Sequence, residues 1–219
     1  MLFRSRFTVR CLQFTFTGGS RFRCSRAVSL VSGVSSMKLV VAATGASGMV
    51  YLQRLLDQID CREHELHLVL SGYAKQVIAD EIEKLRLPAG AREYSERTMN
   101  APFASGSALF DAMVVVPCSM GTLGRIAAGT SETLILRSAD VFLKERRKLI
   151  LVPRETPWNL IHARNCCSLL EAGAVILPAS PAFYSRPQTI EEAADTVVHR
   201  ILDQIGLPPL KTFRWGESE

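Results

Sequence analysis

Short turns rich in glycine, serine and threonine follow several apolar runs of this 219-residue chain. Gly45-Ala46-Ser47-Gly48 ends one such run, Ser119-Met120-Gly121-Thr122 ends another, and Ser71 ends a third. Main-chain N–H groups and hydroxyls in a turn that opens a helix bind phosphates and other anions. One such turn alone could serve close packing, and none completes the GxGxxG pattern of dinucleotide-binding folds. Three together favour a site for a phosphate or a polar cofactor.

Charged side chains occupy a comparable position after a fourth apolar run. Arg154 and Glu155 follow that run directly, where the carboxylate could donate or accept a proton near a ligand. A capping salt bridge between the two residues is the alternative. Arg137, Asp140 and Lys144 are spaced three and four apart, so a helix would place them on one face. An ordinary exposed ladder of ion pairs would account for that spacing equally well.

The remaining polar residues carry weaker signals. Tyr184 and Arg200, taken singly, are consistent with structural roles. The six cysteines include no CxxC pair, and the four histidines show no spacing typical of a metal site. The sequence therefore indicates neither a disulfide scaffold nor a zinc module, and it favours a reduced compartment.

Alternating strands and helices must position these turns. The strand-like runs are 38–44, 65–71, 112–117, 148–153 and 174–178. Helical patterns lie between them, with helices expected over about 73–85 and 131–147 and a loop over 88–111. At least five strands alternating with helices predict one domain built on a doubly wound parallel α/β sheet, covered on both faces. Ligands bind such sheets beyond the carboxyl ends of the strands, where the polar turns lie.

Capping signals set the limits of the later helices. Thr156 with Pro157 is typical of an N-cap followed by proline at the first helical position. Gly173 stands where a C-terminal cap is expected, and Thr189 with Glu192 predicts a capping box.

The positive charge of the chain is confined to its N-terminal segment. The net charge is +5, from 26 basic and 21 acidic residues. Residues 1–36 hold six arginines and no acid, so residues 37–219 carry a net charge of −1. Residues 37–219 therefore need no nucleic acid as a partner. No stretch of about 18 uninterrupted apolar residues occurs, which disfavours a transmembrane helix and a membrane partner.

The same segment, 1–36, is expected to be a disordered leader outside the folded domain, 37–219. Its arginines, seven serines and lack of acids are typical of a mitochondrial or chloroplast transit peptide. The alternative is that Met37, directly before the first strand-like run, is the true start. The first case predicts a mitochondrial or plastid protein, and the second predicts a cytoplasmic one.

Long motifs throughout residues 37–219 resemble those of the flavin prenyltransferase (UbiX) family, once described as aromatic-acid decarboxylases. In chain order they are GASGMVYLQRLL, PCSMGTLGRIAAG, RSADVFLKERRKLILVPRETPWNLIH, GAVILPASPAFYSRPQ and FRWGE. The resemblance implies a Rossmann-like or flavodoxin-like flavoprotein fold and a metal-independent transferase. Its reaction would join the dimethylallyl group of dimethylallyl phosphate to N5 and C6 of reduced FMN. The product, prenylated FMN, would be the cofactor of partner UbiD-type decarboxylases.

The resemblance also implies which residues face the flavin. Glu155 matches the family's acid near flavin N5, Ser47 matches its hydroxyl partner, and Glu81 matches a second carboxylate. The matching FMN contacts are Gly45, Ala46, Ser47, Ser71, Ser119, Met120, Gly121, Thr122 and Arg154.

The prenyl phosphate would be bound by a second, basic group of residues. Lys144, Tyr184 and Arg200 match the family's phosphate-binding positions, and Arg137 matches a further basic residue of that pocket. Positive charge there would stabilise the departing phosphate. The resemblance also implies a homo-dodecamer with sites between subunits, in which Trp215 matches a tryptophan that can cover a neighbour's site.

Three alternative functions stay open at this stage. An FMN-dependent decarboxylase of the phosphopantothenoylcysteine type would use a histidine before the third strand, but residues 72–112 contain none. The other two are direct decarboxylation of aromatic acids by this chain alone and a non-catalytic FMN-binding chaperone. The chain also departs from the family's common pattern at Gly72-Tyr73, where Lys-Ala is usual, and at Ser138, where alanine is usual.

Overall fold

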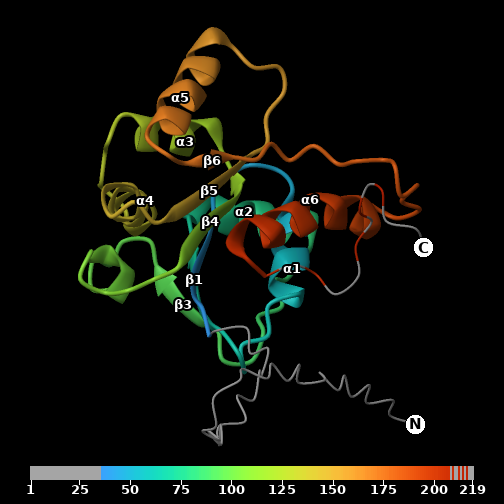
Figure 1. Ribbon diagram of the computed structural model, residues 1–219, viewed down its shortest axis with the longest axis horizontal. Coiled ribbons are helices and arrows are strands. Elements are labelled where there is room, and N and C mark those ends of the chain that lie inside the picture. The colour runs from blue at the N-terminus through green and yellow to red at the C-terminus, as the bar shows by residue number, and fades with distance from the viewer. Residues whose placement is uncertain (1–35, 208, 210–211, 213, 215, 217–219) are drawn as a thin grey trace, which may run out of the picture. The chain divides into compact units, whose positions relative to one another are not determined.

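Six parallel strands form one sheet in the computed structural model, which describes residues 36–207, 209, 212, 214 and 216. The strands are β1 (Lys38–Ala43), β2 (Glu65–Leu70), β3 (Arg92–Ser95), β4 (Ala112–Cys118), β5 (Lys148–Pro153) and β6 (Val175–Ile176). Their order is β3-β2-β1-β4-β5-β6, and every pairing is parallel (Figure 1). The direction of winding reverses between β1 and β4, which is where doubly wound sheets bind ligands. The predicted doubly wound sheet is confirmed.

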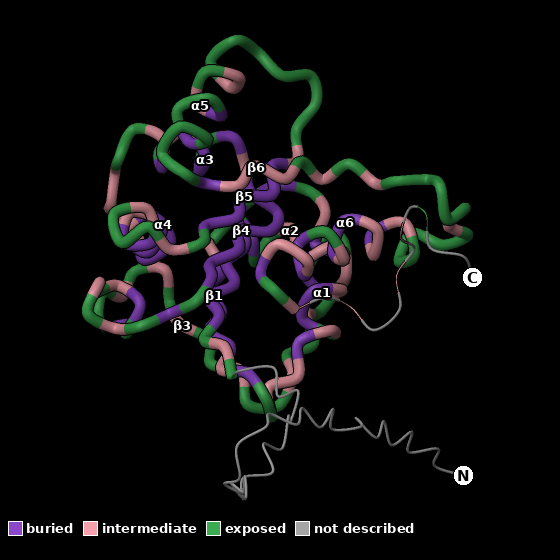
Figure 2. The backbone as a smooth tube through the Cα atoms, in the orientation of Figure 1, coloured by how far each residue is buried: buried purple, intermediate pink, exposed green. Residues whose placement is uncertain are grey.

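Helices cover both faces of this sheet. They are α1 (Met49–Asp57), α2 (Gly72–Glu81), the short 3-10 helix η1 (Pro102–Ala104), α3 (Met120–Ala127), α4 (Leu134–Lys144), α5 (Leu160–Glu171) and α6 (Ile190–Ile205). Leu39 and Val41 of β1 pack in one core cluster with α1, α2 and α6, whereas Val40 and Ala42 pack in the other with α3, α4 and α5. The buried residues accordingly line the strands and the inner sides of the helices (Figure 2). Consequently α4 and α6 lie on opposite faces of the sheet.

Two of the predictions made from the sequence concern residues that the structure does not describe. Residues 1–35 of the predicted leader are not described, and neither is Trp215. Among the helices that are described, none is long and apolar enough to cross a membrane.

The start of α5 differs from the prediction. The Thr156–Pro157 peptide bond is cis, and the helix begins at Leu160, four residues after Thr156. Asn159 is the N-cap, because its Oδ1 accepts a hydrogen bond of 2.9 Å from the main-chain N–H of His162. The predicted cap at Thr156 is therefore wrong. The predicted C-terminal glycine is confirmed, since Gly173 has a φ of 97° just beyond the helix.

Two other predictions were right only in part. The hydroxyl of Thr189 accepts a hydrogen bond from the N–H of Glu192, so the N-cap of α6 is confirmed. The reciprocal bond of the capping box is absent, because the Glu192 carboxylate accepts from Gln188 N instead. The predicted loop 88–111 contains β3 and η1.

A buried histidine joins β2 to β3 and to the following loop. His67 has no exposed surface, and its Nδ1 and Nε2 lie 3.0 Å from the Tyr94 hydroxyl and from Glu65 Oε1. The rings of Phe103 and Phe110 pack edge-on against it. Burial lowers the pKa of His67, although the Glu65 carboxylate acts in the opposite direction. The imidazole is therefore neutral near pH 7 and depends on its two polar partners.

Tyr94→Phe should lower the free energy of unfolding by about 1–3 kcal/mol, because it leaves a buried imidazole nitrogen without its partner. Urea denaturation at pH 7 measures this change. Tyr73→Phe is the control, since Tyr73 is 73% exposed and should tolerate the loss of its hydroxyl. Equal stability of the Tyr94 variant and the wild type would show that the hydroxyl does not support His67.

Candidate active site

The carboxyl ends of β1 and β4 are tied together by Thr44. Its hydroxyl donates to Pro117 O at 3.2 Å and accepts from Ser119 N at 2.8 Å, and the residue is buried. These bonds hold the turn after β1 beside the turn after β4, on the two sides of the winding reversal. Thr44 was not among the predicted site residues, and its place at the end of the apolar run 38–44 is the only signal of its role in the sequence.

Two glycines show which sides of these turns are filled. A Cβ at Gly45 would lie 2.4 Å from Tyr73 Cβ, so the turn after β1 packs directly on α2. A Cβ at Gly121 would have nothing within 4 Å, so the first turn of α3 is open on that side. A flavin or its phosphate therefore has room to approach α3.

Two serines predicted as cofactor contacts cap helices. Ser71 Oγ accepts from Ala74 N at 3.0 Å and begins α2. Ser119 Oγ accepts from Thr122 N at 3.3 Å and begins α3, while its hydroxyl hydrogen points to Thr122 Oγ1 at 3.1 Å. A capping hydroxyl that accepts one bond still has its own hydrogen to donate. Ser71 and Thr122 can therefore cap or support a helix and also donate to a ligand.

Glu81 occupies the N-terminus of α1. Its Oε2 accepts hydrogen bonds of 2.8 Å from the main-chain N–H groups of Gly48 and Met49. Burial raises the pKa of Glu81, but hydrogen bonds from the Ser47 hydroxyl and from these N–H groups, with the charge of Arg154, outweigh it and lower the pKa overall. The carboxylate is thus ionised and fills the anion-binding end of α1. A ligand phosphate must then bind elsewhere, and the open first turn of α3 has room for it.

Glu81→Gln should lower the free energy of unfolding at pH 7 by about 1 kcal/mol, a modest value because solvent screens the exposed carboxylate. A lowered carboxyl pKa stabilises the fold fully above the ordinary value of 4.5, and this stabilisation is lost as the pH falls through the lowered pKa. The difference between variant and wild type should therefore shrink in acid.

Urea denaturation across this pH range measures that difference. Asp80→Asn is the control, because it removes the same charge from the exposed neighbour of Glu81 and should leave the free energy of unfolding at pH 7 unchanged. A difference that is independent of pH would contradict the charge-based account.

Arg154 reaches from the end of β5 back to the turn after β1. Its Nε donates to Ser47 O at 3.1 Å. Among the described residues no ion pair joins Arg154 to Glu155, so the capping salt bridge considered above is wrong. Glu155 Oε1 instead accepts from Thr156 N at 3.0 Å, and Glu155 O accepts from Trp158 Nε1 at 3.0 Å. Both charged residues line an open pocket of about 340 Å³.

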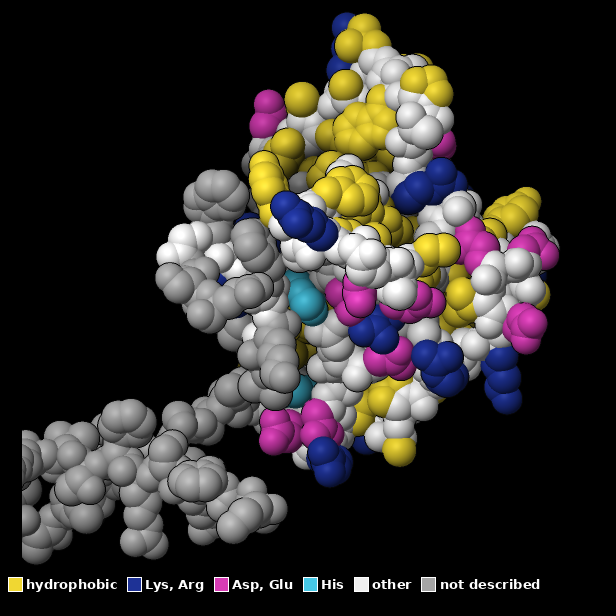
Figure 3. Space-filling view, turned by 90° about the vertical axis from the view of Figure 1, so that its right-hand side faces the viewer, with side chains coloured by type: hydrophobic (Ala, Val, Ile, Leu, Met, Phe, Trp, Pro, Cys, Tyr) yellow, Lys and Arg dark blue, Asp and Glu magenta, His cyan; other side chains and the backbone are white. Residues whose placement is uncertain are grey.

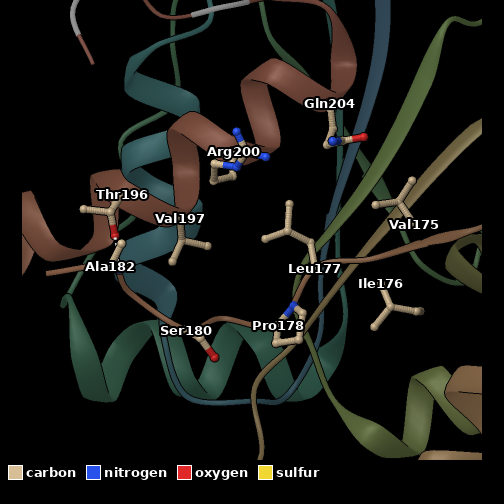
Figure 4. A pocket seen from close by; sticks show the side chains of 10 residues that line it. All are labelled: Val175, Ile176, Leu177, Pro178, Ser180, Ala182, Thr196, Val197, Arg200 and Gln204. Atoms are coloured by element: carbon tan, nitrogen blue, oxygen red, sulfur yellow. Dashed lines mark hydrogen bonds between the residues drawn. The ribbon is translucent and has the colours of Figure 1, made fainter. Parts of the chain in front are cut away.

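Arg200 lines a second open pocket, of about 300 Å³, between α6 and the segment formed by β6 and the residues that follow it (Figure 4). The segment is fastened to α6 by a hydrogen bond of 2.9 Å from Ala182 N to Thr196 Oγ1. Arg200 Nη1 lies 3.3 Å from Asp203 Oδ2. Tyr184 follows the same segment and is 72% exposed. These two predicted phosphate ligands therefore belong to the same side of the sheet.

Arg137 and Lys144 lie elsewhere, on α4. Arg137 pairs with Asp140 at 2.8 Å, while the Lys144 ammonium pairs with its neighbour Glu145, so Lys144 does not continue the ion-pair ladder. Lys144 precedes β5 and Glu155 follows it, so the six residues of β5, at about 3.3 Å each, keep them well apart. One chain does not bring Lys144 together with Glu155 or Arg200.

No group of three or more His, Cys, Asp or Glu side chains in the described part of the chain is arranged to hold a metal ion. The site consists instead of helix N-termini, hydroxyls, two carboxylates and arginines. These groups fit a flavin with its phosphate: the open first turn of α3 has room for it, and Arg154 keeps donors beyond the one bound to Ser47.

Known proteins share this sequence and fold. Residues 30–206 match the family described as Flavoprotein. The chain is 45% identical to the flavin prenyltransferase UbiX of Methanocaldococcus jannaschii, over 82% of this chain and 99% of that protein. It is also 45% identical to the flavin prenyltransferase UbiX of Pseudomonas aeruginosa, over 83% of this chain and 95% of that protein.

Solved structures with the same fold support this family relationship. The crystal structure of AnUbiX (PadA1) in complex with FMN and dimethylallyl pyrophosphate has a TM-score of 0.78 and 42% identity, covering 84% of this chain and 100% of that one. A mutant phosphopantothenoylcysteine (PPC) decarboxylase, 19% identical with a TM-score of 0.51, shares the fold alone. Since sequence, fold and the polar edge of the sheet all agree, this chain belongs to the UbiX family of flavin prenyltransferases.

Proposed function

We propose that this chain transfers the dimethylallyl group of dimethylallyl phosphate to N5 and C6 of reduced FMN. The observation that carries the proposal is the meeting of Arg154, which follows β5 directly before Glu155, with the Ser47 turn after β1 and with Glu81 from the end of α2. Bound reduced FMN would supply the nucleophilic N5 and C6 atoms. The protein would orient the flavin against the allylic carbon, exclude water and manage protons.

Arg154 would bind the flavin, and Glu155 would transfer protons beside it. Arg154 is fixed by its Nε to Ser47 O, so its two Nη groups can donate to the flavin. Glu155 uses Oε1 to accept from Thr156 N, and within the described residues nothing is bonded to Oε2. That oxygen can accept a proton and return it, as general acid–base catalysis requires. Ser47 and Glu81, which are hydrogen-bonded to each other, would be a further hydroxyl–carboxylate group able to hold or move a proton.

The prenyl phosphate would need basic residues from two copies of the chain. Arg200 and Tyr184 lie on the α6 side, while Arg137 and Lys144 lie on α4, across the sheet. A second copy could present its α4 to the α6 side of the first and complete the phosphate site. The pyrophosphate held by AnUbiX supports a prenyl phosphate donor for this chain too.

Exposed apolar side chains support such an assembly. Leu160, Ile161 and Leu170 of α5 are each more than half exposed, and hydrophobic side chains gather over the upper part of the face in Figure 3. Apolar patches of this kind are typical of protein interfaces. The UbiX-like decarboxylase of Escherichia coli O157:H7, 41% identical with a TM-score of 0.74 over 83% of this chain and 100% of its own, is dodecameric. We extend that assembly to this chain.

The proposed product should activate a UbiD-type decarboxylase. Protein-free filtrates of anaerobic reactions are added to a purified UbiD-type apo-decarboxylase, and substrate decarboxylation is measured. We expect activity only when the filtrate comes from a reaction that held this chain, reduced FMN and dimethylallyl phosphate together. Activation by FMN alone, or decarboxylation of the aromatic acid by this chain without the partner, would contradict the proposal.

A further inference from the structure

The chain turns sharply at Arg146, just after the end of α4, and Arg147 follows at this turn. Arg146 has a φ of 53°, in the left-handed region that residues with side chains rarely adopt. Its N–H donates to Leu143 O, and the N–H of Arg147 donates to Phe142 O at 2.8 Å. This turn ends the helix and directs the chain into β5, with Arg147 half-buried at the bend.

The Arg147 guanidinium holds a loop from a distant part of the chain. Its Nη1 donates to Ala108 O and its Nη2 donates to Gly106 O, both at 2.6 Å. Arg137 Nε donates to Ala104 O of the same loop at 3.1 Å. Three alternate carbonyls of the loop 104–108 are therefore held by two arginines of the α4 region. A lysine could not replace Arg147, because only a planar guanidinium presents two donors side by side.

The loop in turn limits where Lys144 can lie. A Cβ at Gly106 would lie 2.7 Å from Lys144 Nζ and 2.2 Å from Glu145 Oε1, so both charged groups lie against this glycine and would have to move for any larger residue. The loop also carries Ser105 and Ser107, whose hydroxyl oxygens are 3.0 Å apart beside this contact. Lys144 is thus seated against a backbone segment that Arg147 keeps in place.

We propose that Arg147 is a positioning residue for binding of the prenyl phosphate, acting through the loop 104–108 on Lys144. This inference rests on the proposed function, in which Lys144 contacts the phosphate. Both Nη groups of Arg147 donate to main-chain carbonyls, so Arg147 would not bind the phosphate itself but would hold the loop in position. Losing it should free the loop and let the Lys144 ammonium occupy many positions.

Steady-state prenyl transfer by the full chain, with dimethylallyl phosphate varied at saturating reduced FMN, tests the inference. Arg147→Ala should raise the KM for dimethylallyl phosphate by about tenfold, within the loss that misplacing a binding group causes. The kcat and the affinity for FMN should change less, by about threefold at most. Added guanidinium ion should lower the raised KM, because it can bind the two freed carbonyls.

Arg146→Ala is the matched control. It removes the same charge one residue away, from an exposed side chain that makes no hydrogen bond or ion pair in the described part of the chain. An equal rise in KM for both variants would show that charge, and not the position of the loop, is responsible. An unchanged KM in Arg147→Ala would also overturn the inference.

Gly106→Ala keeps the test decisive if Arg147→Ala does not fold. It retains the arginine bonds but pushes Lys144 and Glu145 off the loop, so we expect a similar rise in KM with an unchanged melting temperature. A folded Gly106→Ala enzyme with wild-type KM would contradict the inference while leaving the proposed function intact. Absence of transfer by the wild type would overturn the proposed function itself.

Discussion

Glu155→Gln is expected to slow prenyl transfer by a factor of about 10²–10⁴ while FMN still binds. The amide has the size of the carboxylate and can still accept the bond from Thr156 N, so the pocket should keep its shape. It cannot take up and return a proton, which is the role we assign to Oε2. Single-turnover transfer under anaerobic conditions measures the rate, and flavin titration measures binding.

Glu171→Gln is the control for this substitution. Glu171 is an exposed carboxylate at the end of α5, outside both pockets, and its variant should keep the wild-type rate. A Glu155→Gln enzyme within about threefold of the wild type would show that this carboxylate is not the proton-transfer group.

Lys144→Ala and Arg200→Ala are each expected to lower kcat/KM for dimethylallyl phosphate by about 10²-fold, because each removes a charged donor from the departing phosphate. Mixed oligomers of the two variants should recover activity. Since α4 and α6 lie on opposite faces of one chain, a site takes Lys144 from one copy and Arg200 from another. With random mixing, about a quarter of the sites should hold both residues intact.

The mixing experiment has one control and one outcome that would contradict the shared site. The double variant Lys144→Ala/Arg200→Ala, dissociated and reassembled in the same way, should stay inactive. If the mixed single variants also stay inactive while forming mixed oligomers, both residues must act from the same chain, and the shared-site proposal is wrong.

Much of the fold could be predicted because its strands are apolar and β-branched and end in small polar turns. The runs after which Ser47, Ser71, Ser119 and Arg154 were singled out are strands of one parallel sheet. Parallel strands place their carboxyl ends at one edge, so the order of turns along the chain sufficed to find that edge.

The missed elements depend on contacts between distant segments. β3 reads Arg-Glu-Tyr-Ser, a largely exposed edge strand whose pairing follows from the register with β2 and from the bond between Tyr94 and His67. No local pattern of apolar residues marks such a strand. Likewise, Glu81 caps α1 from 32 residues away, a contact that no spacing within either segment predicts.

The positions of the basic residues in space could not be predicted from the sequence either. Lys144 and Arg154 are ten residues apart, yet β5 separates them, and Lys144 faces the loop 104–108. Which face of the sheet a helix covers depends on the three-dimensional winding of the chain. The separation of Lys144 from Arg200, and with it the need for a second copy, follows only from the structure.

The mass of the flavin after reaction tests the central claim most directly. The full chain is incubated anaerobically with reduced FMN and dimethylallyl phosphate, and the extracted flavin is analysed by mass spectrometry. The account predicts a gain of one five-carbon prenyl unit, absent when the donor is omitted and lost in Glu155→Gln. Bound FMN of unchanged mass in the wild-type reaction would contradict prenyl transfer and favour a protein that only binds and carries FMN.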